Sequence, residues 1–451
     1  MRQNLLNLLP KRLVELANAC DNPLFVVGGA VRDYLAGLES NGAKDWDICS
    51  PMPFEAFLNT AKKLGFEIKS IFKNTGTVKC KDLDGVEYEY TSFRSDKYVR
   101  GVHVPIETFF TDDISLDAKR RDFTCNAVYF DIQKGEFCDP LGGIPAIEEK
   151  RLTAVAPADK VFSEDGLRLM RLARQAGQLG FTPDSDCLQG AANHAELIDD
   201  ISPERIYAEL CAILSADKKY GVKDGHYQGL KLLEQTGVLA RIFPDLAKGK
   251  NMAQRADFHK YDVLEHSLRA AWYADEKVRL AALLHDIGKP FCTIRDGNSY
   301  AHHEEGAKLA KAALIRLKAP KRLIERIPAL IEWHMYDFNC QTGENKLRRF
   351  FVQRYPILED LLALKQADFS ACTDDFSVAP TCARWRALLK KMKNEGAPLT
   401  LKELALSGKE LLDLGIPAPK ISQTLQALLL HAACNPKDNT KERLLKLAPH
   451  M

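Results

Sequence analysis

Two aspartates with one residue between them, Asp45 and Asp47 in the segment KDWDI, follow shortly after the glycines Gly28 and Gly29 in FVVGGAVRD. Residues two apart in a strand point to the same face, so we expect both carboxylates to project together while Trp46 points the other way. Two carboxylates on one face suit Mg²⁺, which prefers oxygen ligands and keeps places for water and phosphate oxygens. The glycines let a phosphate approach backbone N–H groups at the start of a helix. Together these features predict a site for a nucleotide and a metal ion.

A second group of side chains lies in the downstream half of the chain and combines imidazoles with carboxylates. Its centre is LLHDIGKP, where a histidine and an aspartate are adjacent. Mixed ligands of this kind suit Mn, Fe, Co, Ni or Zn better than calcium. The sequence therefore predicts a second metal site. Its candidate ligands, in chain order, are His266, His285, Asp286, His302, His334 and Asp368.

Composition and charge exclude several classes of protein. With 451 residues, 46% apolar and 27% charged, the chain is long enough for several domains and is ordinary for a soluble protein. It has no run of about 18 apolar residues and no basic-then-apolar leader, so we expect neither a membrane span nor a targeting segment. The twelve cysteines form no CxxC pair, which argues against a zinc ribbon and favours a reducing cytoplasm. Because the net charge is only +2, contacts with a polyanion must come from local basic patches.

Periodicity divides the chain into a mixed N-terminal part and a helical remainder. Runs rich in β-branched and aromatic residues predict strands at 24–27, 85–94, 123–131 and 135–139. Helical periodicity predicts helices at 31–37, 54–64, 163–179, 203–215, 227–239, 262–286, 304–317, 320–334, 344–367, 383–394 and 422–432. The segment 95–119 has few apolar anchors, and we expect a mobile loop there. The predicted fold class is α+β, with a mixed α/β head followed by a long all-α body.

Five motifs follow one another in the first half of the chain. After FVVGGAVRDYLAG with KDWDI come RRDFTCNAVYFD, DPLGG, SEDGLRLMRLARQAGQLGF and SPERIYAEL. This series resembles the motifs of the class II nucleotidyltransferases, the bacterial CCA-adding enzymes and poly(A) polymerases. The resemblance implies that Asp45 and Asp47 are catalytic and bind Mg²⁺. It also implies a nucleotide-binding set made of Gly28, Gly29, Arg32, Arg121, Asp122, Asn126, Asp165, Arg168, Arg171 and Arg205.

The activity implied by this resemblance is transfer of a nucleotide to an RNA 3′ end. The 3′-hydroxyl attacks the α-phosphate in line and pyrophosphate leaves, while two metal ions stabilise the attacking and departing oxygens. Glu89 in EYEYTSFR is either a further acidic neighbour of this site or an ordinary residue of a strand edge.

Asp165 and Arg168 offer a way to select the base without a nucleic-acid template. Their i, i+3 spacing puts both on one helix face. Cytosine and adenine share an amino donor next to a ring-nitrogen acceptor, which a carboxylate and a guanidinium match, whereas uracil and guanine do not. A surface salt bridge is the alternative on spacing alone. In SPERIYAEL, Arg205 and Glu209 are expected to lock the template helix, while Gly166 costs up to about 1 kcal/mol in a helix and predicts a less rigid template.

The downstream order of His, His-Asp and Asp resembles the HD phosphohydrolase superfamily, and His302 and His334 match its binuclear members. Some bacterial CCA-adding enzymes carry such a domain after the polymerase head. The resemblance implies phosphatase or cyclic phosphodiesterase activity with a transition metal such as Mn, Ni or Fe. A domain that has lost this activity and serves as a scaffold is the alternative.

From these motifs we predict four regions. They are a nucleotidyltransferase head at 1–150, a helical nucleobase-template and RNA-binding region at 151–250, an HD phosphohydrolase domain at 251–380 and a helical tail at 381–451. The tail segment LKELALSGKELLDLGIPAPKI resembles the part of HD-containing CCA-adding enzymes that contacts the body of tRNA. Basic clusters in the helical part are either phosphate contacts or solvated helix faces.

Three functions compete for the whole chain. The favoured one is a cytoplasmic CCA-adding enzyme that extends tRNA with CTP and ATP. The second is a poly(A) polymerase acting on other RNA 3′ ends, against which the HD motif counts, since bacterial members usually lack it. The third is a nucleotide phosphohydrolase driven by the HD site, with a regulatory head. The sequence leaves open the choice between CCA, CC-only and A-only addition, and it leaves open the oligomeric state.

Overall fold

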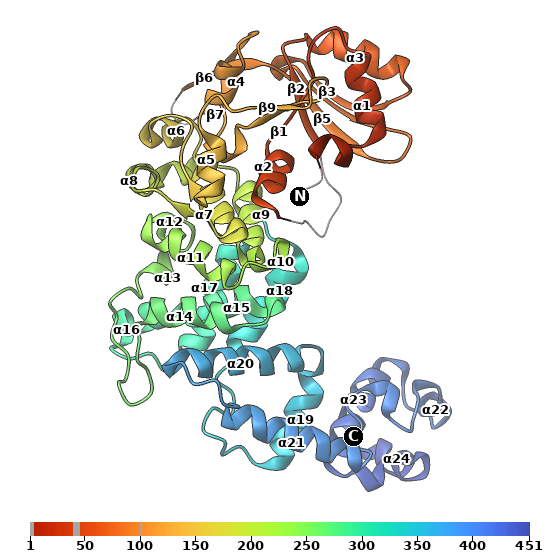
Figure 1. Cartoon of the computed structure of the whole chain (residues 1–451). Coiled ribbons are helices and arrows are strands. Elements are labelled where there is room, and N and C mark those ends of the chain that lie inside the picture. The colour runs from red at the N-terminus through yellow and green to blue at the C-terminus, as the bar shows by residue number, and fades with distance from the viewer. Residues whose placement is uncertain (1–3, 39–45, 100–101) are drawn as a thin grey trace. The chain divides into compact units, whose positions relative to one another are not determined.

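The computed structural model describes residues 4–38, 46–99 and 102–451. The chain forms two compact units, Met1–Pro244 and Asp245–Met451, each with its own core (Figure 1). The described strands all lie in the first unit, and the second unit is helical. This arrangement confirms the α+β fold class.

The head of the first unit is built on a mixed sheet. Among the described residues it has seven strands in the order β3-β4-β5-β2-β1-β8-β9, with β2 and β5 parallel and all other neighbours antiparallel. Alternation along β5 buries Tyr88 and Tyr90, and Tyr90 stacks on Phe57 of α3 with ring centroids 3.8 Å apart. The strands are β1 Phe25–Val27, β2 Trp46–Ser50, β3 Glu67–Phe72, β4 Thr77–Lys81, β5 Glu87–Ser92, β8 Tyr129–Asp131 and β9 Glu136–Cys138.

Helices pack against this sheet, and one of them follows the glycine turn. The chain leaves β1, turns at Gly28 and enters α2, which contacts β1, β2 and α5. α3 packs against β4 and β5. The head helices are α1 Lys11–Asn18, α2 Gly29–Ala36, α3 Phe54–Lys63, α4 Ile114–Lys119 and α5 Gly143–Glu148.

Two expectations about the head were wrong. The segment expected to be a loop forms the hairpin of β6 (Arg94–Val99) and β7 (Val102–Phe110), and α4 follows it. Cross-strand pairs such as Lys97 with Glu107, 3.0 Å apart, take the place of apolar anchors there. The strand expected at 123–131 begins only with β8, because side-chain hydrogen bonds of Asp122 hold a 3₁₀ turn before it.

The rest of the first unit is helical, with α7 packed against α9 and α11. The helix expected at 163–179 is two helices, since Asp165 and Gly166 separate α6 from α7. A short parallel pair, β10 (Arg151–Leu152) and β11 (Thr182–Pro183), lies beside them. The helices are α6 Ala158–Glu164, α7 Leu167–Leu179, α8 Ser185–Asn193, α9 Pro203–Leu214, α10 Ala216–Lys219, α11 Gly225–Gln235 and α12 Val238–Ile242, and α13 Pro244–Ala247 follows at the boundary between the units.

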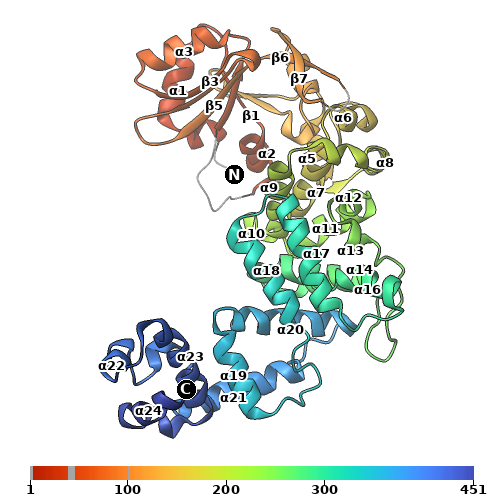
Figure 2. The same ribbon diagram turned by 180° about the vertical axis from the view of Figure 1, so that it is seen from behind.

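In the second unit α14 packs against α15 and α20, and α17 lies beside α18 (Figure 2). Two predicted long helices are each divided. The first breaks where Ala274 is extended, and the second breaks at Pro356, which lacks the N–H that a helix interior needs. The helices are α14 Val263–Tyr273, α15 Arg279–Leu284, α16 Gly288–Asp296, α17 His302–Arg316, α18 Lys321–Trp333, α19 Glu344–Gln353, α20 Leu358–Thr373, α21 Pro380–Asn394, α22 Gly408–Asp413, α23 Ala418–Cys434 and α24 Lys441–Leu447. Within the described ranges, none of the helices has the length and apolarity that crossing a bilayer requires.

Candidate active sites

A pocket of about 400 Å³ in the first unit gathers the residues predicted for a nucleotide site. Among the described residues its lining has eight basic side chains and three carboxylates, an excess of positive charge that suits a triphosphate. The whole predicted nucleotide-binding set lines it: Gly28, Gly29, Arg32, Arg121, Asp122, Asn126, Asp165, Arg168, Arg171 and Arg205. The other lining residues are Asp47, Arg120, Leu167, Arg174, Gln175 and Lys219.

Asp47 lies on β2 next to the start of α2. Gly28 has φ +76°, and a Cβ there would lie only 3.1 Å from Asp47 Oδ2, so both the backbone angle and the close approach favour glycine. Trp46 is buried and Asp47 is exposed, as alternation along a strand predicts. Asp45 falls outside the described residues, so its pairing with Asp47 stays a prediction.

Glu89 is the register partner of Asp47 on the neighbouring parallel strand β5. Register partners present their side chains on the same face, which places a second carboxylate beside Asp47. The Glu89 carboxylate forms an ion pair with Lys79 at 2.8 Å.

A buried network joins α2, the turn before β8 and α7. Arg32 Nη1 donates to Asn126 Oδ1 at 2.8 Å, and Asn126 Nδ2 donates to Asp122 Oδ1 at 2.8 Å and to Gln175 Oε1 at 3.0 Å. Arg171 Nε donates to Asp122 Oδ2 at 2.8 Å. Burial would raise the pKa of Asp122, but the charge of Arg171 and these hydrogen bonds outweigh it and hold the pKa below its usual range. The carboxylate therefore stays ionised and fixes three lining side chains.

Arg121 is oriented from behind by Asp117 and Tyr129. Arg121 Nη2 donates to Asp117 Oδ2 and Arg121 Nε to Tyr129 Oη, both at 3.1 Å. Burial would raise the pKa of Asp117, yet the charges of Arg120 and Arg121 lower it to about 2. The pair of arginines is thus held at the pocket by one buried carboxylate.

Asp165 and Arg168 both line the pocket, but they do not share a helix face as predicted. α6 ends at Glu164, and Asp165 has extended backbone (φ −148°, ψ 109°). Its Oδ1 accepts a hydrogen bond from Leu167 N at 3.0 Å, because aspartate readily caps the N-terminus of a helix. Asp165 therefore belongs to the turn before α7, and Arg168 to the first turn of α7.

The Arg168 guanidinium is held in one orientation, and the residue as a whole is only 5% exposed. Its Nη1 donates to Val161 O at 2.8 Å and to Glu164 Oε2 at 2.9 Å, and its Nη2 donates to Arg120 O at 2.7 Å. Tyr98 of β6 lies against it, 5.7 Å from the ring centroid. Arginine has five N–H donors, so within the described part of the chain this arrangement leaves donors for a ligand.

α9 contacts the turn before α7 and the middle of α7 through two charged side chains. Arg205 Nη2 lies 3.9 Å from Asp165 Oδ2, and Glu209 Oε2 accepts from Arg174 Nε at 2.6 Å. The expectation of a less rigid template assumed that Gly166 lies in a helix interior. Gly166 instead immediately precedes α7, so that reason does not apply. A Cβ at Gly166 would lie 2.6 Å from the Leu197 carbonyl oxygen, so glycine permits a close backbone approach there.

Four polar residues of the pocket were missed from the sequence, in addition to Leu167. Arg120 adjoins Arg121, and Arg174 and Gln175 stand one helical turn after Arg171, so helical spacing is the signal that would have found them. Lys219 lies nine residues beyond the last motif, SPERIYAEL, and no sequence pattern marks it.

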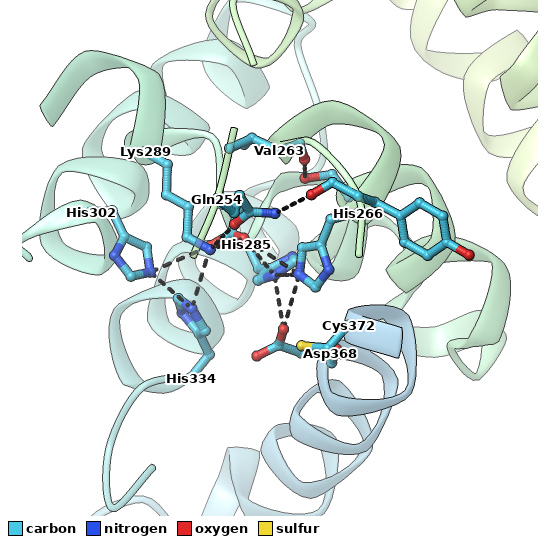
Figure 3. A network of polar contacts seen from close by, with 12 residues as sticks. Gln254, Val263, His266, His285, Lys289, His302, His334, Asp368 and Cys372 are labelled. Carbon is cyan, nitrogen blue, oxygen red and sulfur yellow. Dashed lines mark hydrogen bonds and ion pairs between the residues drawn. The ribbon is translucent and has the colours of Figure 1, made fainter. Parts of the chain in front are cut away.

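In the second unit four of the six candidate metal ligands converge, and Figure 3 labels three of them, His266, His285 and Asp368. His266 Nε2 lies 3.2 Å from His285 Nε2 and 3.0 Å from Asp368 Oδ1. Asp286 Oδ2 lies 3.2 Å from His285 Nε2 and 3.5 Å from His266 Nε2. Two imidazoles and two carboxylates thus face one point.

Asp286 also faces the two remaining histidines. Its Oδ1 lies 3.4 Å from His302 Nε2 and 3.9 Å from His334 Nε2, and these two nitrogens are 3.3 Å apart. Asp286 therefore stands between two imidazole groups, with one oxygen toward each. All six predicted ligands come together, and we call them the HD cluster.

The surroundings of the HD cluster fit divalent metal ions. Nδ1 of His285, His302 and His334 lies 2.6–2.7 Å from backbone carbonyl oxygens, which turns each Nε2 toward the cluster. Asp286 Oδ1 is buried without a hydrogen-bond donor among the described residues. Burial lowers the pKa of His285, but Asp286 and Asp368 outweigh it and raise the pKa to about 10. The cluster thus attracts positive charge, which a metal ion supplies.

Other side chains adjoin the HD cluster. Lys289 Nζ lies 2.7 Å from Asp286 Oδ2 and donates to Gln254 Oε1 at 2.7 Å. Sequence reasoning missed His259 and Cys372, although His259 stands only seven residues before His266. Burial and the charge of Lys289 lower the pKa of His259 to about 4, so this imidazole is neutral at physiological pH.

Three family models match the chain and cover most residues of both sites. The poly A polymerase head domain matches residues 24–153, and the probable RNA and SrmB-binding site of polymerase A matches 180–250. The HD domain matches 259–368, which contains the whole HD cluster.

Relatives match over nearly the whole length. The chain is 31% identical to an A-adding tRNA nucleotidyltransferase of Deinococcus radiodurans, over 89% of this chain and 90% of the relative. It is 30% identical to a CC-adding tRNA nucleotidyltransferase of Thermus thermophilus, over 93% and 91%. Its fold matches the crystal structure of a Bacillus stearothermophilus CCA-adding enzyme in complex with CTP, with a TM-score of 0.63, 24% identity and coverage of 98% and 96%. The chain belongs to the tRNA nucleotidyltransferase family, in the group that combines a poly(A) polymerase-type head with an HD domain.

Proposed function

We propose that this chain is a tRNA nucleotidyltransferase that adds the 3′-terminal CCA, or part of it, to tRNA from CTP and ATP without a nucleic-acid template. The observation that carries the proposal is a single pocket in the first unit. Its lining combines Asp47 with the basic side chains, Asp165 and Arg168. The relatives named above, which are of similar length, act on tRNA by their names, and this supports tRNA as the substrate.

Asp47, together with Asp45, is the proposed ligand set for Mg²⁺. The exposed carboxylate of Asp47 beside the start of α2, with Glu89 in register, is an oxygen-rich surface of the kind that Mg²⁺ prefers. When bound, Mg²⁺ supplies positive charge to the phosphate oxygens of an in-line displacement. Gly28 and Gly29 offer backbone N–H groups to the triphosphate.

Base selection is assigned to Asp165 and Arg168. Asp165 Oδ1 caps Leu167, so its Oδ2 is the oxygen we assign to the exocyclic amino group of cytosine or adenine. Arg168 donates to the neighbouring ring nitrogen. Uracil and guanine present a carbonyl and an N–H instead, and a mismatch of this kind costs about 1–3 kcal/mol.

The decisive experiment uses one tRNA with three 3′ ends: lacking CCA, ending in C and ending in CC. Each is incubated with labelled CTP or ATP alone, and then with both. Full CCA addition gives two C from CTP on the first substrate and one A from ATP only after CC. Arrest after CC, or activity only on the CC end, identifies a partial enzyme. Long A tails on unrelated RNA would favour a poly(A) polymerase, and no incorporation at all would overturn the proposal.

The position of Asp286 between two imidazole groups favours a second activity. We propose that the HD cluster holds two transition-metal ions such as Mn, Ni or Fe and hydrolyses phosphoesters. When bound, the ions supply Lewis-acid activation of water and phosphate. Lys289, which already pairs with Asp286, offsets phosphate charge. Hydrolysis of 2′,3′-cyclic AMP, measured with each metal and with a chelator, tests this. If no metal supports hydrolysis, the HD cluster is a scaffold.

The regional roles are also proposals. We assign nucleotidyl transfer to 1–150, template and RNA binding to 151–250, phosphohydrolysis to 251–380 and contact with the tRNA body to 381–451. All twelve cysteines are free thiols, which supports a cytoplasmic location in a reducing compartment.

A further inference from the structure

Beside the HD cluster the structure brings together two imidazoles and a thiol. His259 precedes α14, His266 lies in α14, and Cys372 lies in the last turn of α20. Each offers one ligand atom, and the three atoms lie within 4.8 Å of one another. Figure 3 shows the Cys372 sulfur next to Asp368 at the edge of the HD cluster. Only His266 is common to the two groups.

The loop that carries His259 is fixed against the end of α20. Lys260 N donates to Cys372 O at 2.9 Å, so the residue after His259 is hydrogen-bonded to the backbone of the thiol residue. Tyr261 Oη donates to Asp374, just beyond α20, and Gln254 Nε2 donates to Tyr261 O at 3.2 Å. The three ligand groups are therefore held near one another without a cation.

Two imidazole nitrogens in this group lack partners. His266 is fully buried, and its Nε2 faces the HD cluster. Its Nδ1, and Nδ1 of His259, have no hydrogen-bond partner within residues 4–38, 46–99 and 102–451. The Nδ1 atoms of His285, His302 and His334, by contrast, contact backbone carbonyls. A buried polar atom left unpaired is destabilising, so these two nitrogens point to a ligand.

We propose that His259, His266 and Cys372 form a separate cation site that takes Zn²⁺. Zinc accepts nitrogen and sulfur ligands tetrahedrally, and its usual bond lengths place ligand atoms roughly 3.4–3.7 Å apart, within reach of small side-chain rotations. The thiol gives its proton to solvent as the sulfur–zinc bond forms, and water takes the fourth position. Sulfur selects zinc over the harder metals, whereas the HD cluster has only nitrogen and oxygen ligands.

The shared ring links this site to the HD cluster. When zinc binds His266, the imidazole becomes a weaker ligand for a metal ion in the HD cluster, or it turns away from that cluster altogether. Excess Zn²⁺ should therefore inhibit the hydrolysis proposed above in wild-type enzyme. This consequence rests on the proposed HD activity, whereas zinc binding itself does not.

The first test is spectroscopic and needs no activity. Co²⁺ is added to metal-free full-length protein, because a cobalt–thiolate bond gives a charge-transfer absorption in the near ultraviolet that nitrogen and oxygen ligands do not give. We expect this band in wild type and in the control Cys434→Ser, and its loss in Cys372→Ser. His259→Gln should weaken or remove the band through a second ligand. Absence of the band in wild type, or its persistence in Cys372→Ser, would overturn the proposal.

The second test counts zinc. Equilibrium dialysis should show one Zn²⁺ fewer per chain in Cys372→Ser than in wild type and in Cys434→Ser, with unchanged melting temperatures of the metal-free proteins. Cys372→Ser should also keep Mn²⁺- or Ni²⁺-dependent hydrolysis and lose its inhibition by excess Zn²⁺. Equal zinc content in all three proteins contradicts the site, even if hydrolysis is never observed. A failure of hydrolysis alone leaves the spectroscopic and stoichiometric results to decide.

Discussion

The side chains of the nucleotide pocket differ in how deeply they are buried and in how many hydrogen bonds hold them in place. Asp47 is exposed, so its chemistry can be changed without disturbing a core. Asp122 and Arg168 are buried in hydrogen-bond networks, and their replacement leaves unpaired partners. Residues that bind a ligand can therefore be separated experimentally from residues that position them.

Replacing Asp47 by asparagine is expected to abolish nucleotide addition while the melting temperature stays the same. The change removes a metal-binding charge from an exposed position and opens no cavity. Loss of a group that only supports a metal ligand lowers metal affinity or activity roughly 10–100-fold. Because Asp47 is itself a proposed ligand, CTP incorporation should fall by more than this in Asp47→Asn. The control is Glu87→Gln, an exposed carboxylate on β5 outside the pocket. Near-normal incorporation by Asp47→Asn would contradict the metal assignment.

Asp165→Ala is the cleaner test of base selection. We expect the preference for CTP and ATP over UTP and GTP to fall about 10-fold or more, as loss of a paired contact worth about 1–3 kcal/mol predicts. Steady-state incorporation of all four nucleotides measures it. Arg168→Ala removes three internal hydrogen bonds as well, so it should also lower the melting temperature. Unchanged selectivity in Asp165→Ala would contradict the template assignment.

Asp117 makes the head sensitive to acid. Its pKa is lowered from 3.8 to about 2, so the ionised form stabilises the folded state above pH 4, and this contribution is lost as pH falls toward 2. A shift of this size corresponds to about 2 kcal/mol. Urea unfolding of wild type and Asp117→Asn from pH 2 to 6 measures it. Wild type should be more stable at pH 6, with the difference shrinking below pH 4, and a difference independent of pH would contradict the assignment.

At the scale of secondary structure, the sequence predicts elements better than their ends. The helix at 203–215 agrees with α9 to within a residue, because Pro203 marks its first turn. The helix predicted at 163–179 is divided, since continuous apolar periodicity conceals a turn that aspartate and glycine make. The β6–β7 hairpin was missed because cross-strand pairs such as Lys97 with Glu107, and not a run of apolar residues, stabilise it.

The turn between α6 and α7 requires glycine. A Cβ at residue 166 would lie 2.6 Å from the Leu197 carbonyl oxygen, so Gly166→Ala must displace backbone. We expect it to destabilise the chain by about 1–3 kcal/mol and to reduce nucleotide addition, because Asp165 moves with the turn. Thermal unfolding and CTP incorporation measure both effects. Gly343→Ala is the control, since its Cβ would meet nothing within 4 Å and its φ is −60°. Equal stability of the two variants would contradict this account.

At the scale of the whole molecule, the order of the motifs predicts which motif residues come together in each site. It does not predict every other residue beside those sites. All six predicted ligands of the HD cluster come together, and so do all ten predicted nucleotide-binding residues, because each belongs to a motif with its own spacing. Lys219 could not be predicted, since nothing local marks a side chain that reaches a site only through packing of distant helices. Cys372, by contrast, stands one helical turn after Asp368 on α20, so helical spacing is the signal that would have found it. The pocket lies wholly in Met1–Pro244 and the HD cluster wholly in Asp245–Met451.

This division predicts that the two activities can be separated. His285→Ala combined with Asp286→Ala removes an imidazole and the carboxylate that stands between both metal positions, so hydrolysis of 2′,3′-cyclic AMP with Mn²⁺ or Ni²⁺ should be lost. CCA addition with Mg²⁺ should stay within about two-fold of wild type, because the residues that line the pocket belong to Met1–Pro244 whereas His285 and Asp286 belong to Asp245–Met451. Both activities are measured on the same preparation, together with its melting temperature. If the double variant keeps its stability but loses CCA addition, the two units are energetically coupled and the independence argued here is wrong.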